Sequence, residues 1–154
     1  GGAVALCVLA ERPVPVAAAA LVNPAIRARS VVGLVEGLIG RPYSWTERSR
    51  AAADRLDFVA RADDIAARAP QPPLLLASGE QDHPALRADA ADLVAALRSR
   101  YTAPDTVRAV TIPGLAHPLA EEPGLEPLPG LAAASAVDKA LTDWFLTHLG
   151  GPQR

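Results

Sequence analysis

An aspartate and a histidine each follow an apolar segment of this 154-residue chain, and together they could carry out proton transfer. Asp82 stands after the apolar run 74–77 and a glycine-containing turn, and His117 stands after a second apolar segment and the bend Pro113-Gly114. A carboxylate that accepts a hydrogen bond from an imidazole orients that ring as the general base for a nucleophile. The pattern therefore indicates the acid and the base of a nucleophile–base–acid relay.

Both residues also have a structural interpretation. Asp82 could cap the helix that we predict over 84–98, because Asp favours turns and helix starts, and His117 could be an ordinary loop histidine. The cap and acid roles do not exclude each other, and the presence of both residues in this order favours the pair. We interpret His83 as a surface residue or as one that supports the site from behind, with the surface role favoured, and His148 as a residue that suits the end of the last helix.

The sequence offers no nucleophile in a suitable setting. Cys7 lies in an apolar segment, where thiols are usually inert. Ser78 is too close to the acid, and Ser30 and Ser44 lack the tight glycine-flanked turn that exposes a nucleophilic serine. The three histidines and the single cysteine have no metal-ligand spacing, so we expect no metal site.

The elements that must position Asp82 and His117 follow from hydrophobic periodicity. We predict strands over 14–22, 74–77 and 106–112, and helices over 2–10, from Ser30 to Ile39, over 46–56, from a cap at Asp57 to Ala69, over 84–98, and from Val137 to about Gly150. The first strand is apolar on both faces, as in the middle of a parallel sheet. This order predicts an α/β fold with a parallel sheet.

The segment 23–69 is too long for an ordinary connection and is predicted to form a helical insertion. Its apolar side chains could line a substrate pocket or simply bury the insertion against the core; they are Leu34, Leu38, Tyr43 and Trp45. Asp64 and Arg68 are spaced as an i, i+4 ion pair on an exposed helix face. A proline-rich stretch, 121–130, follows His117 and is expected to be a mobile loop.

Composition limits the partners. The net charge of −2 and the lack of basic runs give no reason to expect nucleic-acid binding. No stretch reaches the ~18 apolar residues of a spanning helix, and no signal peptide is visible. The single cysteine fits a reducing compartment, so we expect a cytoplasmic location.

Three sequence features resemble the α/β-hydrolase family. Gly1-Gly2 before an apolar helix is similar to the end of the G-x-S-x-G nucleophile elbow, 79–82 reads G-E-x-D, and 114–117 reads G-x-x-H. Acid before histidine is also the family's order. The resemblance covers 1–154 as the C-terminal part of one domain, with 23–69 as its helical cap or lid.

The resemblance implies an esterase- or lipase-like serine hydrolase that cleaves an ester, thioester or amide through an acyl-enzyme. Asp82 would be the triad acid and His117 the general base, with the serine two positions before Gly1 and no cofactor. The chain alone would then be inactive. We expect a small acyl substrate as partner, and either the upstream half of the domain or self-association to complete the core.

Other functions of the same scaffold remain open. They are carbon–carbon bond hydrolysis, haloalkane dehalogenation with Asp as the nucleophile, peptidase activity, and a non-catalytic binding domain. The residue two positions before Gly1 separates these possibilities, because a dehalogenase would carry Asp there.

Overall fold

Three parallel strands form the centre of the molecule, which is known here from a computed structural model that describes residues 1–118 and 132–150. The strands are β1 (Ala19–Val22), β2 (Leu74–Gly79) and β3 (Val107–Ile112), in the order β1-β2-β3. Both neighbouring pairs are parallel. The predicted α/β organisation with a parallel sheet is therefore confirmed. The proline-rich stretch 121–130 lies outside the described residues.

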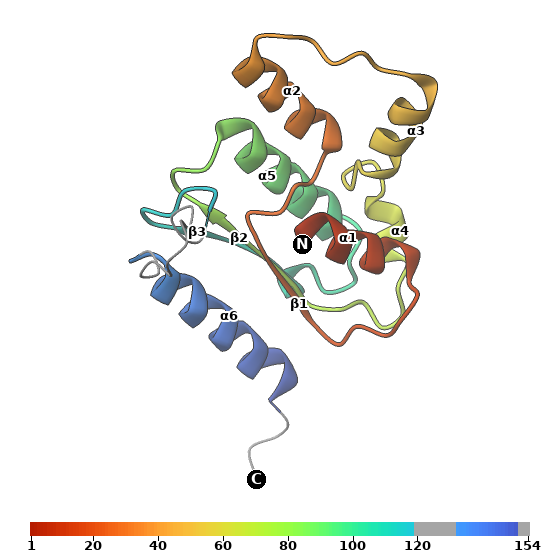
Figure 1. The fold of residues 1–154 in the computed structure, drawn as a ribbon. Helices are drawn as coiled ribbons and strands as arrows, with labels where there is room; N and C mark the ends of the chain where they lie inside the picture. Colours follow the sequence, from red (N-terminus) through yellow and green to blue (C-terminus); the bar gives the residue numbers. More distant parts are fainter. Residues whose placement is uncertain (119–131, 151–154) are drawn as a thin grey trace.

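Helices flank the sheet on both faces (Figure 1). The helices are α1 (Gly2–Glu11), α2 (Ala28–Ile39), α3 (Glu47–Arg55), α4 (Ala62–Ala66), α5 (Pro84–Arg98) and α6 (Ala134–Leu149), with a short 3₁₀ turn at Pro104–Thr106. α1 and α5 cover one face and α6 covers the other, while α2 and α3 lie farther from the sheet. α4 packs against α1 and α5.

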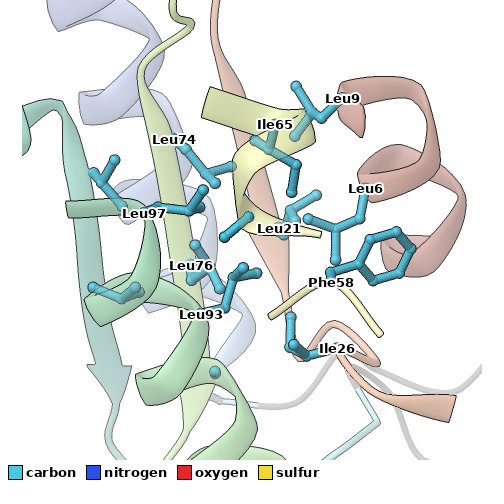
Figure 2. Close-up of a cluster of buried hydrophobic side chains, with 14 of the residues drawn as sticks. Leu6, Leu9, Leu21, Ile26, Phe58, Ile65, Leu74, Leu76, Leu93 and Leu97 are labelled. Carbon is cyan, nitrogen blue, oxygen red and sulfur yellow. The ribbon is translucent and has the colours of Figure 1, made fainter. Parts of the chain in front are cut away.

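The strand β2 is buried on both faces because it is the central strand. Leu74 and Leu76 face the larger core cluster, whereas Ala77 faces a smaller cluster against α6, as the alternation of side chains along a strand requires. Figure 2 shows the larger cluster, whose side chains come from α1, α5, the sheet, α4 and the segments just before α2 and α4. Its labelled members are Leu6, Leu9, Leu21, Ile26, Phe58, Ile65, Leu74, Leu76, Leu93 and Leu97. This core fixes the strand from which Asp82 emerges.

The structure corrects the first predicted strand, 14–22. Only Ala19–Val22 is a strand, and Val14 is 52% exposed. Pro13 and Pro15 have no backbone N–H to donate to a ladder, so the chain reaches the sheet only after them.

Two predicted helix starts are also wrong. α2 begins at Ala28 with Arg27 as its N-cap residue, so Ser30 lies inside its first turn. α4 is much shorter than the predicted helix from Asp57 to Ala69.

Two backbone hydrogen bonds explain these differences. The Ala28 N–H donates to the Leu56 oxygen, and the Phe58 N–H donates to the Ile26 oxygen. These bonds hold Arg27 and Asp57 in an antiparallel bridge and keep both segments extended. Asp57 instead accepts a hydrogen bond from the Ala60 N–H.

The predicted surface pair of Asp64 and Arg68 does not form. Arg68 is buried and donates to the backbone oxygens of Val8, Leu9 and Val14, at 3.1, 3.2 and 2.6 Å. Asp64 instead pairs with Arg61, at 2.9 Å. The carbonyl groups of Val8, Leu9 and Val14 lie at and just after the end of α1, where few backbone donors remain. The Arg68 guanidinium binds all three, so it joins α1 to the chain that enters β2.

The remaining helices follow their sequence signals. α3 has Thr46 as its N-cap, with the Thr46 and Ser49 side chains each accepting a hydrogen bond from the backbone N–H of the other residue. α5 spans Pro84–Arg98 as predicted, with Pro84 in its first turn. Within the described residues, no helix is both long and apolar enough to cross a lipid bilayer.

The buried side chain of Tyr101 binds the segment that leads into β2. The Tyr101 hydroxyl group donates to the backbone oxygen of Pro72 at 3.2 Å, and the residue is 5% exposed. Burial raises the pKa of Tyr101 to about 12, because the phenolate loses its hydration.

Because of Tyr101, the free energy of unfolding should decrease at alkaline pH. The folded state holds the phenolic proton more tightly than the unfolded chain, whose tyrosine pKa is about 10. Its contribution is therefore complete below about pH 10 and is lost as the pH rises toward about 12, on the order of 2–3 kcal/mol in all. Urea unfolding across this range should show the loss. Tyr101→Phe should reduce the pH dependence, and an unchanged slope in that variant would contradict the assignment.

Candidate active site at the carboxyl ends of the strands

Asp82 and His117 meet at the edge of the sheet where β2 and β3 end. The Nδ1 atom of His117 lies 3.1 Å from Oδ1 of Asp82. The Asp82 side chain is 3% exposed, whereas the His117 side chain is 57% exposed. An ionised carboxylate only accepts hydrogen bonds, so Nδ1 carries the proton in this bond. Nε2 is then free to accept a proton from another group.

A tight turn after β2 directs the aspartate. The Asp82 N–H donates to the backbone oxygen of Gly79 at 3.2 Å, and the His83 N–H donates to Oδ1 of Asp82 at 2.7 Å. The N-cap of α5 is His83, whose Nδ1 accepts a hydrogen bond from the Ala85 N–H. The structure thus places His83, and not Asp82, in the capping position, and Oδ1 of Asp82 is shared between the His83 N–H and the His117 ring.

Gly79 allows the turn after β2 to approach the loop after β3. A Cβ atom at Gly79 would overlap the backbone oxygens of Leu115 and Ala116. Two backbone hydrogen bonds stabilise this close approach: the Glu80 N–H donates to the Ile112 oxygen at 3.0 Å, and the Gln81 N–H donates to the Leu115 oxygen at 2.9 Å. The glycine is therefore required for the meeting of the acid-bearing and histidine-bearing loops.

The pair faces a cleft with a volume of about 820 Å³. Its walls come from the start of α1, the end of β1, the exposed helix α2 and the two loops; they include Gly1, Gly2, Val22, Asn23, Val31, Leu34, Leu38, Gln81, Asp82, His83 and His117. Gly2 also permits a close approach, since a Cβ atom there would lie 2.7 Å from Cβ of Pro24. The N-terminus of α1 consequently borders the same cleft as the Asp82–His117 pair.

The structure brings two of the four predicted pocket residues to this cleft. Leu34 and Leu38 line it from α2, and Leu38 is 86% exposed. Tyr43 and Trp45 do not line it: they pack edge to face at 4.9 Å, and Tyr43 borders a separate groove. Gly40, with a φ of +64°, ends α2, and the chain then returns along the other side of that helix.

The alternative nucleophiles lie elsewhere. Cys7 borders a small hollow with Ala52, Arg55 and Leu56, and the serines of the described segments do not line the cleft. Among the described residues, no cluster of His, Cys, Asp and Glu is arranged to hold a metal ion. His148 lies in the last turn of α6 and stacks on Trp144, with ring centroids 4.1 Å apart.

Sequence reasoning missed the role of Asn23. Its side chain accepts a hydrogen bond from the Gly79 N–H and donates to the backbone oxygens of Ala116 and His117. Its φ is +43°, a conformation that Asn adopts more readily than most residues. An Asn before Pro at a strand end was the available signal, but its partners lie far away in the sequence.

Arg27 was also missed. This residue, at the start of α2, contacts Asp89 at 2.6 Å, Asp92 at 2.8 Å and Asp57 at 3.6 Å. Partial burial disfavours the charged guanidinium, but hydrogen bonds to Asp92 and Asp89 outweigh this and raise the pKa of Arg27. No residue of α2 is buried, so polar contacts attach its first turn: this ion-pair cluster, the Ala28–Leu56 backbone hydrogen bond and the Arg29–Asp54 ion pair.

Comparisons with protein-family models, with curated proteins and with solved structures found no match to this chain. The fold is a small α/β domain in which helices flank a three-stranded parallel sheet.

The role of Gly79 leads to a stability prediction. Gly79→Ala should destabilise the protein by about 2–3 kcal/mol, because its methyl group must push the loop after β3 away. Gly37→Ala is the matched control: its Cβ would meet open space in the exposed helix α2, so it should stabilise by about 0.5–1 kcal/mol. Urea unfolding measures both. A Gly79→Ala protein as stable as the wild type would show that the close approach is not required.

Proposed function

We propose that this chain is the C-terminal part of a serine hydrolase with an α/β-hydrolase fold, which cleaves an ester, thioester or amide. The observation that carries the proposal is the 3.1 Å contact between His117 Nδ1 and Asp82 Oδ1 at the ends of adjacent parallel strands. Ligands of open α/β sheets bind outside the carboxyl ends of the strands. A second support is that the two residues and the start of α1 border one cleft.

His117 acts as the general base in the proposed reaction. Its Nε2 takes the proton of the serine hydroxyl group as the oxygen attacks the acyl carbon, and then gives that proton to the leaving group. The acyl-enzyme is hydrolysed by a water molecule that the same nitrogen deprotonates, and the imidazolium then returns this proton to the serine oxygen as the acid leaves. Asp82 holds the ring in the productive tautomer and stabilises the imidazolium, while its burial shields this interaction from solvent.

The proposed nucleophile stands two positions before Gly1. Gly1 and Gly2 line the cleft, so a residue joined to them through a strand-to-helix turn would approach His117. The close packing of Gly2 on Pro24 fits such a turn, in which glycines allow tight backbone contact. By the resemblance, the oxyanion is stabilised by the N–H after the nucleophile and by another from an early loop.

An uncharged, moderately hydrophobic acyl group suits the cleft. α2 contributes Val31, Leu34 and Leu38 to its lining, whereas Glu36 of the same helix does not line it. In the predicted cap 23–69, Ile26 and Phe58 belong to the main core, while α2 has no buried residue. We therefore assign the movable, substrate-selecting part of the insertion to α2.

The β1 edge of the sheet is the proposed site for the rest of the domain. β1 pairs with β2 on one side, and the described segments supply no strand for its other side. Val4, on the neighbouring helix α1, is 68% exposed. The upstream half of the same domain, or a second copy of the chain, would cover this edge and this apolar surface.

Labelling with a fluorophosphonate tests the proposed function. The full-length protein should be modified at a serine two positions before Gly1, and Asp82→Asn or His117→Ala should lower turnover of a simple acyl ester by on the order of 10³-fold or more. Asp143→Asn and His148→Gln, on α6, are matched controls that should retain activity.

Two results would contradict this proposal. Near-normal turnover in either site variant would remove that residue from the mechanism. The absence of Ser, Cys or Asp two positions before Gly1 would leave only a binding role for the cleft, whereas Asp there would indicate dehalogenase chemistry.

The lining of the cleft predicts the determinants of acyl-chain preference. Leu38→Ala should change the preference between short and longer acyl esters. The ratio of their kcat/KM values should change by the equivalent of about 1–3 kcal/mol, as expected for removal of methylene-scale pocket contacts. Ile39→Ala is the control, because Ile39 is the next residue of α2 but borders the other groove. A panel of esters measures the ratios. Equal ratios for wild type and Leu38→Ala would remove this part of α2 from substrate selection.

A further inference from the structure

The side chain of Asn23 connects three backbone groups from the two loops that carry Asp82 and His117. Its Oδ1 accepts a hydrogen bond from the Gly79 N–H at 2.7 Å, just before the turn that leads to Asp82. Its Nδ2 donates to the backbone oxygen of Ala116 at 2.8 Å and to that of His117 at 2.9 Å. One amide group therefore holds the end of β2 and the histidine loop together.

The position of this amide is itself fixed by the sheet. The Asn23 N–H donates to the backbone oxygen of Ala77 at 2.9 Å, so the residue continues the pairing of β1 with β2. Its left-handed backbone then turns the side chain out of the strand direction, where Asn is tolerated and most L-residues are strained. Both amide hydrogens and the amide oxygen have partners, so the group has a defined orientation.

The histidine needs such an anchor. Its side chain is 57% exposed, so packing does little to fix the ring. Apart from the bond to Asp82, which the ring itself makes, the backbone hydrogen bonds between the two loops end at Leu115, two residues before the histidine. In the described part of the chain, the backbone oxygens of Ala116 and His117 receive their hydrogen bonds from Asn23. The backbone that carries the ring is therefore held by this amide.

We infer that Asn23 is a positioning residue that aims the His117 ring so that Nδ1 points at Asp82 and Nε2 faces the cleft. Its catalytic consequence rests on the proposed function, while its effect on the ring does not. If Asn23 only stabilised the end of the sheet, its loss would lower stability without changing the state of the ring.

Two variants of Asn23 remove different sets of its side-chain hydrogen bonds. Asn23→Gly removes all three side-chain hydrogen bonds and still permits the left-handed backbone. Asn23→Asp keeps an oxygen for the Gly79 N–H but sets a carboxylate, in place of the two N–H donors, against two carbonyl oxygens. Tyr101→Phe is the matched control, because it removes a buried side-chain-to-backbone hydrogen bond outside the cleft.

The direct readout is the tautomer of His117, measured by ¹⁵N chemical shifts of histidine-labelled full-length protein at a pH where the ring is neutral. The resonances are assigned by their loss in His117→Gln. The wild type should show a protonated Nδ1 and an unprotonated Nε2. Asn23→Gly and Asn23→Asp should both shift the equilibrium toward the Nε2–H form that the free side chain favours, whereas Tyr101→Phe should keep the wild-type tautomer.

Activity gives a second readout. In a protein that hydrolyses esters, both Asn23 variants should lower kcat by about 10²-fold, as expected for a slightly misplaced catalytic group, with KM within about twofold. An unchanged tautomer in both Asn23 variants would overturn the inference, whatever the activity. A shifted tautomer in a protein whose wild type has no hydrolase activity would support the positioning role and reject the proposed function.

Discussion

The close approach between the turn after β2 and the loop after β3 is the contact on which the candidate site depends. A parallel sheet delivers both chain segments to one edge, but a sheet alone leaves neighbouring strand exits free to diverge. Gly79 removes the Cβ atom that would keep the two loops apart. The Asn23 amide then bonds to both loops, and Asp82 becomes buried with His117 as its partner.

Much of the fold and part of the site could be predicted from the sequence. Apolar runs gave β2 and β3, and the Pro84–Arg98 helix had clear periodicity. Asp82 and His117 were identifiable as a candidate pair because each lies in the turn or loop that follows a strand. Asn23 and Arg68 were not, because their partners are backbone groups distant along the chain, and such bonds leave no local pattern. The prediction for 14–22 failed because apolar character outweighed the prolines that keep the chain out of the ladder.

The cleft combines a fixed part with a weakly attached one. Asp82 and His117 stand on the sheet, which is held by the main core. The opposite wall is α2, an apolar helix without a buried residue, attached at its start by the Arg27 ion pairs. Chemistry that needs defined geometry and a surface that selects among substrates have opposite structural requirements. Under the proposed function, the division between sheet and helix would meet both requirements, with substrate selection on α2.

A crystal structure of the full-length protein would test the central claim most directly, through the distance from His117 Nε2 to the residue two positions before Gly1. The proposed mechanism predicts a serine there, with its Oγ atom within about 2.6–3.2 Å of Nε2, while Nδ1 still contacts Asp82. A structure in which no nucleophilic side chain reaches Nε2, or in which the His117 ring turns away from Asp82, would contradict it.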